Sequence, residues 1–413
     1  MLREERSMRC FFPQLFYHST YRTPRNRKQS GAAGAVCAAG TPAAARRTHS
    51  ALRPWLLSFV SPLSSPQIFI FRRINFILSG ENDKMEKTDR TCMKGEKGME
   101  NSREILQNVI GQVRQVVVGK EACVEKIMMA MLANGHVLME DIPGVGKTTM
   151  AVAFARALGL EARRMQFTSD VLPSDITGFS VYRKDLQSFV YQPGAVFCNL
   201  FLADEINRTS PKTQSALLEV MEERQVTVEG VTRQVPKPFM VIATQNPSGS
   251  AGTQMLPESQ MDRFLICLSM GYPELSDEIA ILKGRSAGNP LEDIVPAADV
   301  PTLLQMQTEA EQVFVHDVLY EYAAKLVRAT RVHPMAELGM SPRGGLALMR
   351  MMKASAYLKG RNYVTPKDTE QVFADVGVHR IRLNARARAG HVTSRQILEE
   401  VLTQVPRPVP AKR

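Results

Sequence analysis

The residues at positions 136–150 (HVLMEDIPGVGKTTM) have the types and spacing of a phosphate-binding loop. An apolar segment leads into a glycine-containing turn, and Lys147 and Thr148 then open an expected helix. Glycines let backbone N–H groups face an anion, and the N-terminus of a helix adds partial positive charge. The lysine can reach the β- and γ-phosphates of a nucleotide, and the threonine hydroxyl can bind Mg²⁺.

One position departs from the strict pattern of such loops. The pattern G-x-x-x-x-G-K-[ST] requires glycine at position 141, where this chain has Asp141. On this stretch alone, a glycine turn before an ordinary helix is the alternative interpretation. The expected nucleotide-binding residues of the loop are Pro143, Gly144, Val145, Gly146, Lys147, Thr148 and Thr149.

A second group of candidate residues follows the apolar segment 198–203 (CNLFLA). Asp204 and Glu205 come directly after this expected strand. The carboxyl ends of parallel strands form the edge of the sheet where ligands of α/β proteins bind. We expect Asp204 to hold Mg²⁺ or a water bound to it, and Glu205 to polarise an attacking water molecule.

Two further polar residues adjoin expected strands. Asn246 follows the apolar segment 239–243 (FMVIA), where its side chain could orient a water molecule against a phosphate, although a turn before proline is the favoured interpretation when this residue is taken alone. Arg263 precedes the apolar segment FLICLSM. Taken alone, an arginine beside Asp262 is most simply a surface ion pair, which contributes little to stability.

The elements that must position these residues alternate between strands and helices up to about residue 272. The expected strands are residues 137–139, 163–168, 198–203, 239–243 and 264–270. The expected helices are residues 121–134, 150–158 and 211–223. Two expected hairpins, at 179–191 and 225–236, and a turn-rich stretch at 169–178 interrupt this order. The alternation is typical of an α/β fold with a parallel sheet.

Beyond Pro273 the sequence predicts helices without further buried strands. Ser341 is a favourable N-cap and Pro342 a favourable first helical residue, so Arg343 lies in the first turn of an expected helix. We therefore expect a small all-helical second domain. The expected boundaries are an α/β core at 99–272, the helical domain at 273–402 and a Pro-rich basic tail at 403–413.

The first 98 residues differ in composition from the rest of the chain. Residues 1–80 contain twelve Lys and Arg against two acidic residues, whereas the remainder contains 40 basic and 39 acidic residues. We favour a translation start placed upstream of the true one, with a targeting or disordered extension and a real domain as alternatives. The near-neutral remainder gives no argument for nucleic-acid binding.

The six cysteines and the apolar runs limit the remaining possibilities. No pair of cysteines has C-x-x-C spacing, which argues against zinc, and the cysteine usage fits a reducing, cytoplasmic compartment. Cys198 and Cys267 lie in apolar segments and are expected to be buried thiols. No run reaches the roughly 18–20 apolar residues that a spanning helix needs, so no membrane span is expected.

Five motifs in order resemble those of the MoxR family of AAA+ ATPases: the phosphate loop, DEINR, TQNP, LPESQMDRF and SPRGGLAL. The resemblance covers about residues 102–400. It accounts for Asp141, because the phosphate loops of the family resemble E-D-x-P-G-x-G-K-T. It implies an AAA+ P-loop core of α/β class, with a parallel sheet and inserted hairpins, followed by a small all-helical lid domain.

The resemblance also implies ATP and Mg²⁺ as cofactors and a role for each candidate residue. It implies nucleotide binding by Lys147, metal binding by Thr148 and Asp204, and catalysis by Glu205 as the base. Asn246 would be the first sensor, Arg263 the arginine finger acting on ATP of the neighbouring subunit, and Arg343 the second sensor. Val118 and Gly119 would line the adenine pocket, although they also fit a simple connection between two helices.

The function implied by the resemblance is ATP hydrolysis that remodels, assembles or activates a partner protein. Metal-cofactor insertion and cooperation with a protein that bears a von Willebrand factor A domain belong to this expectation, as does a homo-oligomeric ring, expected to be a hexamer. The alternatives are a subunit like the magnesium chelatase ATPase, a nucleic-acid-linked AAA+ motor and a non-hydrolysing scaffold. Competent residues at every catalytic position argue against the scaffold.

Overall fold

The computed structural model describes residues 101–142, 144–246 and 256–408, which belong to one compact unit of the chain. The basic segment 1–98, Pro143 and the end of the basic tail lie outside the described residues. Within the described part of the chain, no helix combines the length and apolar character needed to cross a membrane.

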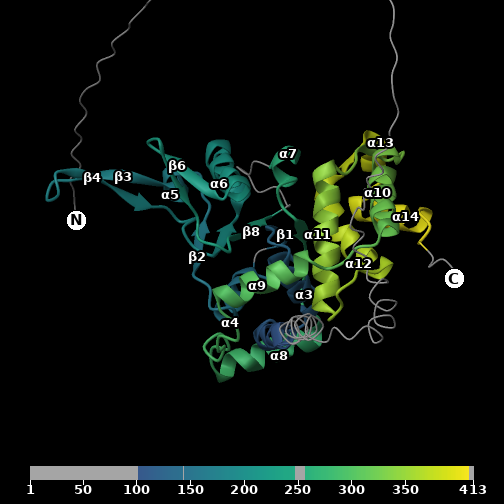
Figure 1. Ribbon diagram of the computed structural model, residues 1–413, viewed down its shortest axis with the longest axis horizontal. Helices are drawn as coiled ribbons and strands as arrows, with labels where there is room; N and C mark the ends of the chain where they lie inside the picture. The colour runs from purple at the N-terminus through teal and green to yellow at the C-terminus, as the bar shows by residue number, and fades with distance from the viewer. Residues whose placement is uncertain (1–100, 143, 247–255, 409–413) are drawn as a thin grey trace, which may run out of the picture. The chain divides into compact units, whose positions relative to one another are not determined.

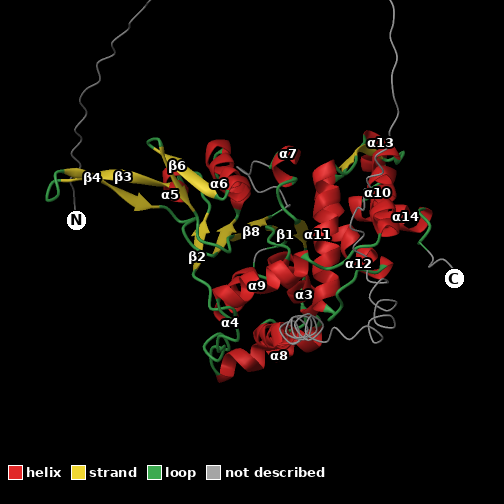
Figure 2. Cartoon of the chain, in the orientation of Figure 1, coloured by secondary structure: helices red, strands yellow, loops and turns green. Residues whose placement is uncertain are grey.

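Five parallel strands form the central sheet of the described residues, in the order β2-β5-β8-β1-β9 (Figures 1 and 2). Their bounds are β1 Val137–Glu140, β2 Ala162–Gln166, β5 Leu200–Asp204, β8 Met240–Gln245 and β9 Ile266–Leu268. The five expected strands are thereby confirmed, with shifts of a few residues at their ends. Parallel pairing places Gln166 opposite Asp204, and Glu140 opposite Gln245, at the carboxyl edge of the sheet.

Alternate side chains of these strands enter two separate apolar clusters, one on each face of the sheet. In β5, Leu200 and Leu202 belong to one cluster, whereas Phe201 and Ala203 belong to the other. Successive strand residues point to opposite faces, so apolar residues at every position bury both faces. The first cluster includes residues of α3 (Glu121–Leu132) and α4 (Lys147–Ala157), and the second includes residues of α6 (Pro211–Glu223).

Two hairpins branch from this α/β core, as the sequence predicts. They are β3 (Gly178–Arg183) with β4 (Ser188–Pro193), and β6 (Gln225–Val228) with β7 (Val231–Gln234). Ser180 of the first donates a hydrogen bond to Glu229 at the turn of the second, over 2.6 Å. The aromatic side chains of Tyr182 and Phe189 are exposed near the tip of the first hairpin.

The stretch at 169–178, expected as turns, contains the short helix α5 (Pro173–Thr177). The Asp175 carboxylate accepts a hydrogen bond from the backbone N–H of Leu172 over 2.9 Å, which caps the first turn. A five-residue helix is too short to give an apolar period, so the expectation of turns alone was wrong.

The residues after β9 form mainly helices. They are α8 Leu275–Ala287, α9 Val300–Glu311, α10 Asp317–Val332, α11 Pro342–Leu358, α12 Pro366–Gly377, the 3-10 helix η2 Val378–Arg380, α13 Ala385–Ala389 and α14 Ser394–Gln404. The region is not all-helical, because β10 (Ala336–Leu338) pairs with β11 (Arg382–Leu383) in a small antiparallel sheet. These short, largely exposed segments carry no apolar pattern that would predict strands.

The start of α12 is fixed by a buried carboxylate. Asp368 accepts hydrogen bonds from the side chains of Arg361, Lys359 and Ser355, and from the backbone N–H and hydroxyl of Thr365. Burial alone would raise the pKa of Asp368, but the hydrogen bonds from Arg361, Lys359 and Thr365 outweigh it and hold the pKa well below its usual range. The ionised carboxylate therefore stabilises this helical region.

We predict that Asp368→Asn lowers the free energy of unfolding by about 3 kcal/mol at pH 7, because it removes the buried charge to which Arg361 and Lys359 pair. The folded-state pKa is depressed, so the contribution is present above the unfolded pKa of about 3.9 and is lost as the pH falls below it. Urea unfolding between pH 7 and pH 3 measures both effects. Lys367→Gln, an exposed neighbour, serves as the control; equal stability of Asp368→Asn and the parent at pH 7 would contradict the prediction.

Candidate functional site

The turn between β1 and α4 forms an open cradle at the carboxyl edge of the sheet. Gly144 and Gly146 adopt φ angles of +87° and +93°, a region that favours glycine. A Cβ atom added at either position would meet no atom within 4 Å. The backbone conformation therefore requires these glycines, and the space beside them is open to a ligand.

Asp141 anchors this turn to the segment that follows β9. Its buried carboxylate accepts hydrogen bonds from the backbone N–H groups of Met270 and Gly271, the latter over 3.0 Å, and from the Ser269 hydroxyl over 3.1 Å. Asp141 is not among the described residues with positive φ, so its position does not require glycine. The departure from the strict glycine pattern thus has a structural role.

The Lys147 side chain lies across the cradle. Its ammonium group donates hydrogen bonds to the backbone carbonyls of Asp141, over 3.0 Å, and Ile142, over 3.2 Å. Partial burial lowers the pKa of Lys147, although the carboxylates of Asp141, Asp204 and Glu205 oppose this shift. The cation is therefore held at the position where an anion in the cradle would meet it.

The ends of β5, β8 and β2 bring polar groups together next to the cradle. Asp204 accepts a hydrogen bond from the Thr244 hydroxyl over 2.6 Å and pairs with the Arg164 guanidinium over 2.8 Å. The Thr244 hydroxyl also accepts from the backbone N–H of Glu205 over 2.9 Å. Both oxygens of the Asp204 carboxylate therefore have partners on neighbouring strands.

Glu205 is held in an unusual backbone conformation. Its φ of +56° lies in the left-handed region, which non-glycine residues seldom adopt. Its carboxylate pairs with the Arg208 guanidinium over 2.6 Å. Such strain is concentrated at functional sites, where the surrounding structure fixes it.

The glycine turn, Lys147 and the acids Asp204 and Glu205 line one cavity of about 400 Å³. The structure brings together eight of the residues expected at the site: Gly144, Gly146, Lys147, Thr148, Thr149, Asp204, Glu205 and Asn246. The cavity also includes Arg164 and Gln166 of β2, which the sequence analysis did not select. Arg164 and Gln166 are alternate residues of one strand, so their side chains share a face. This pattern points to the site only when β2 is known to pair with β5, the strand that ends in Asp204.

Val118 and Gly119 lie outside the lining of this cavity, as does Val145. Gly119 has a φ of +73°, and an added Cβ would lie 2.0 Å from the carboxylate of Asp277 in α8. Lys120 donates hydrogen bonds to the carbonyls of Met270 and Tyr272, over 2.7 and 2.9 Å. This connection therefore packs closely against the segment that joins β9 to α8.

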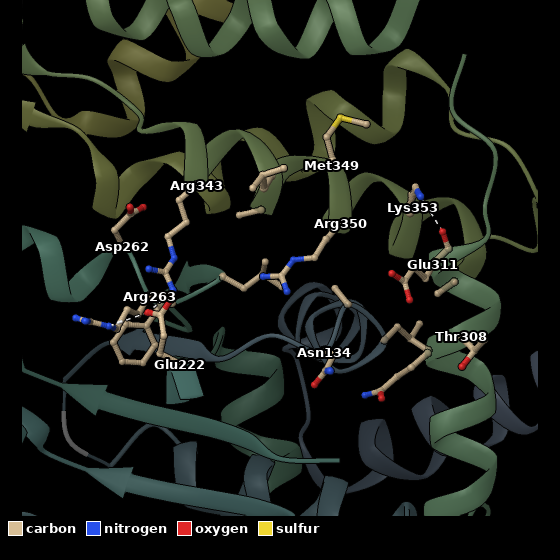
Figure 3. A pocket seen from close by; sticks show the side chains of 18 of the residues that line it. Asn134, Glu222, Asp262, Arg263, Thr308, Glu311, Arg343, Met349, Arg350 and Lys353 are labelled. Carbon is tan, nitrogen blue, oxygen red and sulfur yellow. Dashed lines mark hydrogen bonds and ion pairs between the residues drawn. The ribbon is translucent and has the colours of Figure 1, made fainter. Parts of the chain in front are cut away.

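Arg263 and Arg343 line a different cavity, of about 920 Å³ (Figure 3). The guanidinium groups of Arg263 and Arg343 contact the same oxygen of Glu222, over 3.0 and 2.6 Å. Glu222 lies near the end of α6, whereas Arg343 lies in the first turn of α11. The two cavities share no lining residue, so these arginines are not assembled with the phosphate loop of their own chain.

The residues of the smaller cavity fit a nucleotide with Mg²⁺. The open glycine cradle, the Lys147 ammonium and the start of α4 suit a polyphosphate. The Thr148 hydroxyl and the Asp204 carboxylate line the same space, and oxygen ligands of this kind are those that Mg²⁺ prefers.

We predict that Asp141→Gly, which creates the strict glycine pattern, weakens nucleotide binding about tenfold and lowers the free energy of unfolding by about 1–3 kcal/mol. The reason is that the buried N–H group of Met270 and the partly buried N–H group of Gly271 lose their acceptor. Calorimetric titration with nucleotide and urea unfolding measure the two effects. Asp141→Asn keeps one acceptor oxygen and should give intermediate values; unchanged affinity and stability in Asp141→Gly would disprove the anchoring role.

Comparison with known proteins assigns a family to the α/β core and to the later helices. Residues 136–266 match the family described as "ATPase family associated with various cellular activities (AAA)", and residues 328–401 match the AAA lid domain. The chain resembles a solved structure of a putative ATPase from Cytophaga hutchinsonii, with a TM-score of 0.73 and 34% identity, over 77% of this chain and 99% of that one.

Curated relatives extend the similarity across most of their own length. The protein YeaC of Bacillus subtilis, described as uncharacterized, is 44% identical over 75% of this chain and 97% of its own. Chaperone MoxR1 of Mycobacterium tuberculosis is 38% identical over 76% of this chain and 85% of its own. Protein MoxR of Methylorubrum extorquens is 27% identical over 78% and 99%, respectively. Together with the geometry of the phosphate cavity, these matches place the chain in the MoxR family of AAA ATPases, enzymes that hydrolyse ATP.

Proposed function

We propose that this ATPase uses ATP hydrolysis to remodel, assemble or activate a partner protein, as a chaperone does. The observation that carries the proposal is the single cavity that contains Lys147, Thr148, Asp204, Glu205 and Asn246. The name of the relative Chaperone MoxR1 supports the chaperone-like part. Insertion of a metal cofactor into the partner, with the help of a von Willebrand factor A domain protein, is the narrower form of this proposal.

The residues of the cavity would divide the hydrolysis of ATP among them. On nucleotide binding, the Lys147 ammonium gives up its hydrogen bonds to the loop carbonyls and donates to the β- and γ-phosphates, because a charged phosphate oxygen is a stronger acceptor than a carbonyl. Glu205 accepts a proton from the attacking water, and Asn246 orients that water. Glu205 must first leave the Arg208 guanidinium, since an ion-paired carboxylate is a weaker base.

Thr148 and Asp204 would hold Mg²⁺ through the hydroxyl and the carboxylate. When bound, the ion neutralises charge that develops on the phosphate oxygens. Arg164 occupies one oxygen of Asp204 from the neighbouring strand, so this chain supplies its own cation to the carboxylate. The Arg164 side chain is 52% exposed, so breaking its ion pair with Asp204 to admit Mg²⁺ costs little free energy.

We also propose that the protein acts as a homo-oligomeric ring, as a hexamer, in the cytoplasm. Arg263 lies away from the phosphate cavity of its own chain, and a finger arginine has an effect only beside a γ-phosphate. A neighbouring copy must therefore present its nucleotide to Arg263, and head-to-tail contacts of this kind close into rings. The boundaries proposed for the catalytic and lid domains remain 99–272 and 273–402.

Two other functions use the same chemistry. A nucleic-acid motor would need a basic surface, whereas residues 81–413 carry 40 basic and 39 acidic side chains. A subunit like the magnesium chelatase ATPase would need a porphyrin-handling partner. Stimulation of ATP hydrolysis by DNA would favour the motor, and stimulation by a co-purifying von Willebrand-type protein would favour the chaperone-like function.

We predict that Lys147→Ala abolishes ATP binding, whereas Glu205→Gln keeps binding and loses turnover by about a hundredfold or more. The lysine contacts the nucleotide in the ground state, but the glutamate acts only on the attacking water. Fluorescent-nucleotide titration and phosphate release measure the two properties. Glu223→Gln, which changes an exposed carboxylate of α6, is the matched control. Near-normal hydrolysis in both site variants would refute the proposed assignment.

We further predict that Arg164→Ala lowers the Mg²⁺ concentration at which nucleotide binding is half-maximal, by up to about fivefold, because an exposed ion pair contributes about 0.2–1 kcal/mol. The measurement is nucleotide binding as a function of Mg²⁺ concentration. Arg163→Ala removes the adjacent arginine, which pairs with Glu161 instead, and should leave the Mg²⁺ dependence unchanged. A higher Mg²⁺ requirement in Arg164→Ala would mean that the arginine assists the metal site.

A further inference from the structure

A single buried hydroxyl joins the ends of two strands at the phosphate cavity. β5 and β8 are parallel neighbours, and the pairing of Ala203 with Ala243 brings the next residues, Asp204 and Thr244, side by side. Thr244 is 1% exposed, although it lines the cavity together with Asp204 and Glu205. The Thr244 hydroxyl therefore belongs to the interior of the site, behind the two acids.

The Thr244 hydroxyl acts as a donor and as an acceptor at the same time. An ionised carboxylate can only accept, so the hydroxyl proton is directed at Oδ1 of Asp204, over 2.6 Å. The backbone N–H of Glu205 donates to the same hydroxyl oxygen over 2.9 Å. Two linked hydrogen bonds therefore run from the backbone of Glu205 through Thr244 to the side chain of Asp204, and each strengthens the other.

The two oxygens of the Asp204 carboxylate have different environments. Oδ1 accepts from the buried hydroxyl of Thr244, whereas Oδ2 pairs with the Arg164 guanidinium over 2.8 Å. The ion pair with the exposed Arg164 side chain is easily broken, but a buried hydrogen bond is not. Oδ2 is therefore the oxygen available to an incoming cation, while the bond at Oδ1 keeps the carboxylate in its orientation.

The same hydroxyl holds the backbone of Glu205. The φ of +56° at Glu205 is a conformation that a residue with a side chain keeps only when its surroundings fix it. The N–H of Glu205 is bound by Thr244, and its carbonyl accepts from the N–H of Arg208 over 3.0 Å. Loss of the bond to Thr244 would let this backbone relax and would move the Glu205 carboxylate.

We propose that Thr244 is a positioning residue for ATP hydrolysis, which determines the Asp204 oxygen that faces the metal and fixes the backbone that carries the Glu205 carboxylate. The inference rests on the roles proposed above for Asp204 and Glu205. Thr244 acts through these two acids and transfers no proton in the reaction. A hydroxyl is required, because a valine side chain of similar shape neither donates nor accepts.

The first test is the Mg²⁺ dependence of nucleotide binding in full-length Thr244→Val. Without the hydroxyl, both oxygens of Asp204 are open to the forked guanidinium of Arg164, so Mg²⁺ competes less well. The Mg²⁺ concentration for half-maximal binding of a fluorescent nucleotide should rise about fivefold, with affinity in the absence of Mg²⁺ within about twofold of the parent. This shift is opposite in direction to that predicted for Arg164→Ala.

The second test is the rate of hydrolysis at saturating nucleotide and Mg²⁺. Thr244→Val should lower kcat about tenfold or more, because the Glu205 backbone is released. Thr244→Ser keeps the donor and the acceptor and should stay within about threefold of the parent. Thr244→Ala, a smaller side chain, should show the same losses as Thr244→Val and replaces it if that variant does not fold.

Thr369→Val is the matched control for both tests. It removes a buried hydroxyl of α12 that has no partner among the described residues, and it should change neither the Mg²⁺ dependence nor kcat. A purely structural role of Thr244 predicts lower stability in urea with unchanged kcat. Unchanged kcat and Mg²⁺ dependence in Thr244→Val, or equal losses in Thr244→Ser, would overturn the proposal.

Combination with Glu205→Gln tests whether Thr244 acts through Glu205. If it does, adding Thr244→Val to Glu205→Gln should lower the residual turnover by less than about twofold, since the group that Thr244 positions is already absent. A further tenfold loss would show independent action and would overturn the proposal. Full activity of Glu205→Gln alone would instead contradict the proposed function, so the two failures can be told apart.

Discussion

The attachment of Asp141 to the backbone after β9 is the contact on which the phosphate loop depends. β1 lies between β8 and β9 in the sheet, so a loop at its end can be fixed from either side. The Asp141 carboxylate binds the β9 side through Met270 and Gly271, and its N–H donates to the carbonyl of Gln245 on the β8 side. Because both neighbours hold the first residue of the loop, the following glycines can adopt unusual angles without loosening the site.

The local parts of the site could be predicted from the sequence because each is contiguous. The glycine turn before Lys147 and the acidic pair Asp204-Glu205 follow apolar strands, and parallel strands must end at one edge. Arg164 and Glu222 could not be found in this way. Their significance depends on pairing between β2 and β5 and on contact between α6 and α11, which no local pattern specifies.

The separation of the two cavities gives one chain two unequal faces. One face carries the phosphate cradle, with Lys147 and the two acids. The other carries four guanidinium groups and three carboxylates, and Glu222 pairs with two of the guanidinium groups. Because the ion pair of Glu222 and Arg343 joins α6 to α11, a change at this carboxylate also changes the contact between the core and the helices that follow it. In the proposed ring, ATP hydrolysis in one copy would thereby alter the arrangement of the neighbouring copy.

The hydrogen bonds of Lys147 to the carbonyls of Asp141 and Ile142 have a consequence for the affinity of nucleotide binding. A lysine side chain free in solvent would lose up to about 2 kcal/mol of conformational entropy on binding a phosphate. Here the side chain is already confined at the cradle, so that loss is incurred when the protein folds. The site is therefore preorganised, and more of the interaction energy with the nucleotide remains as affinity.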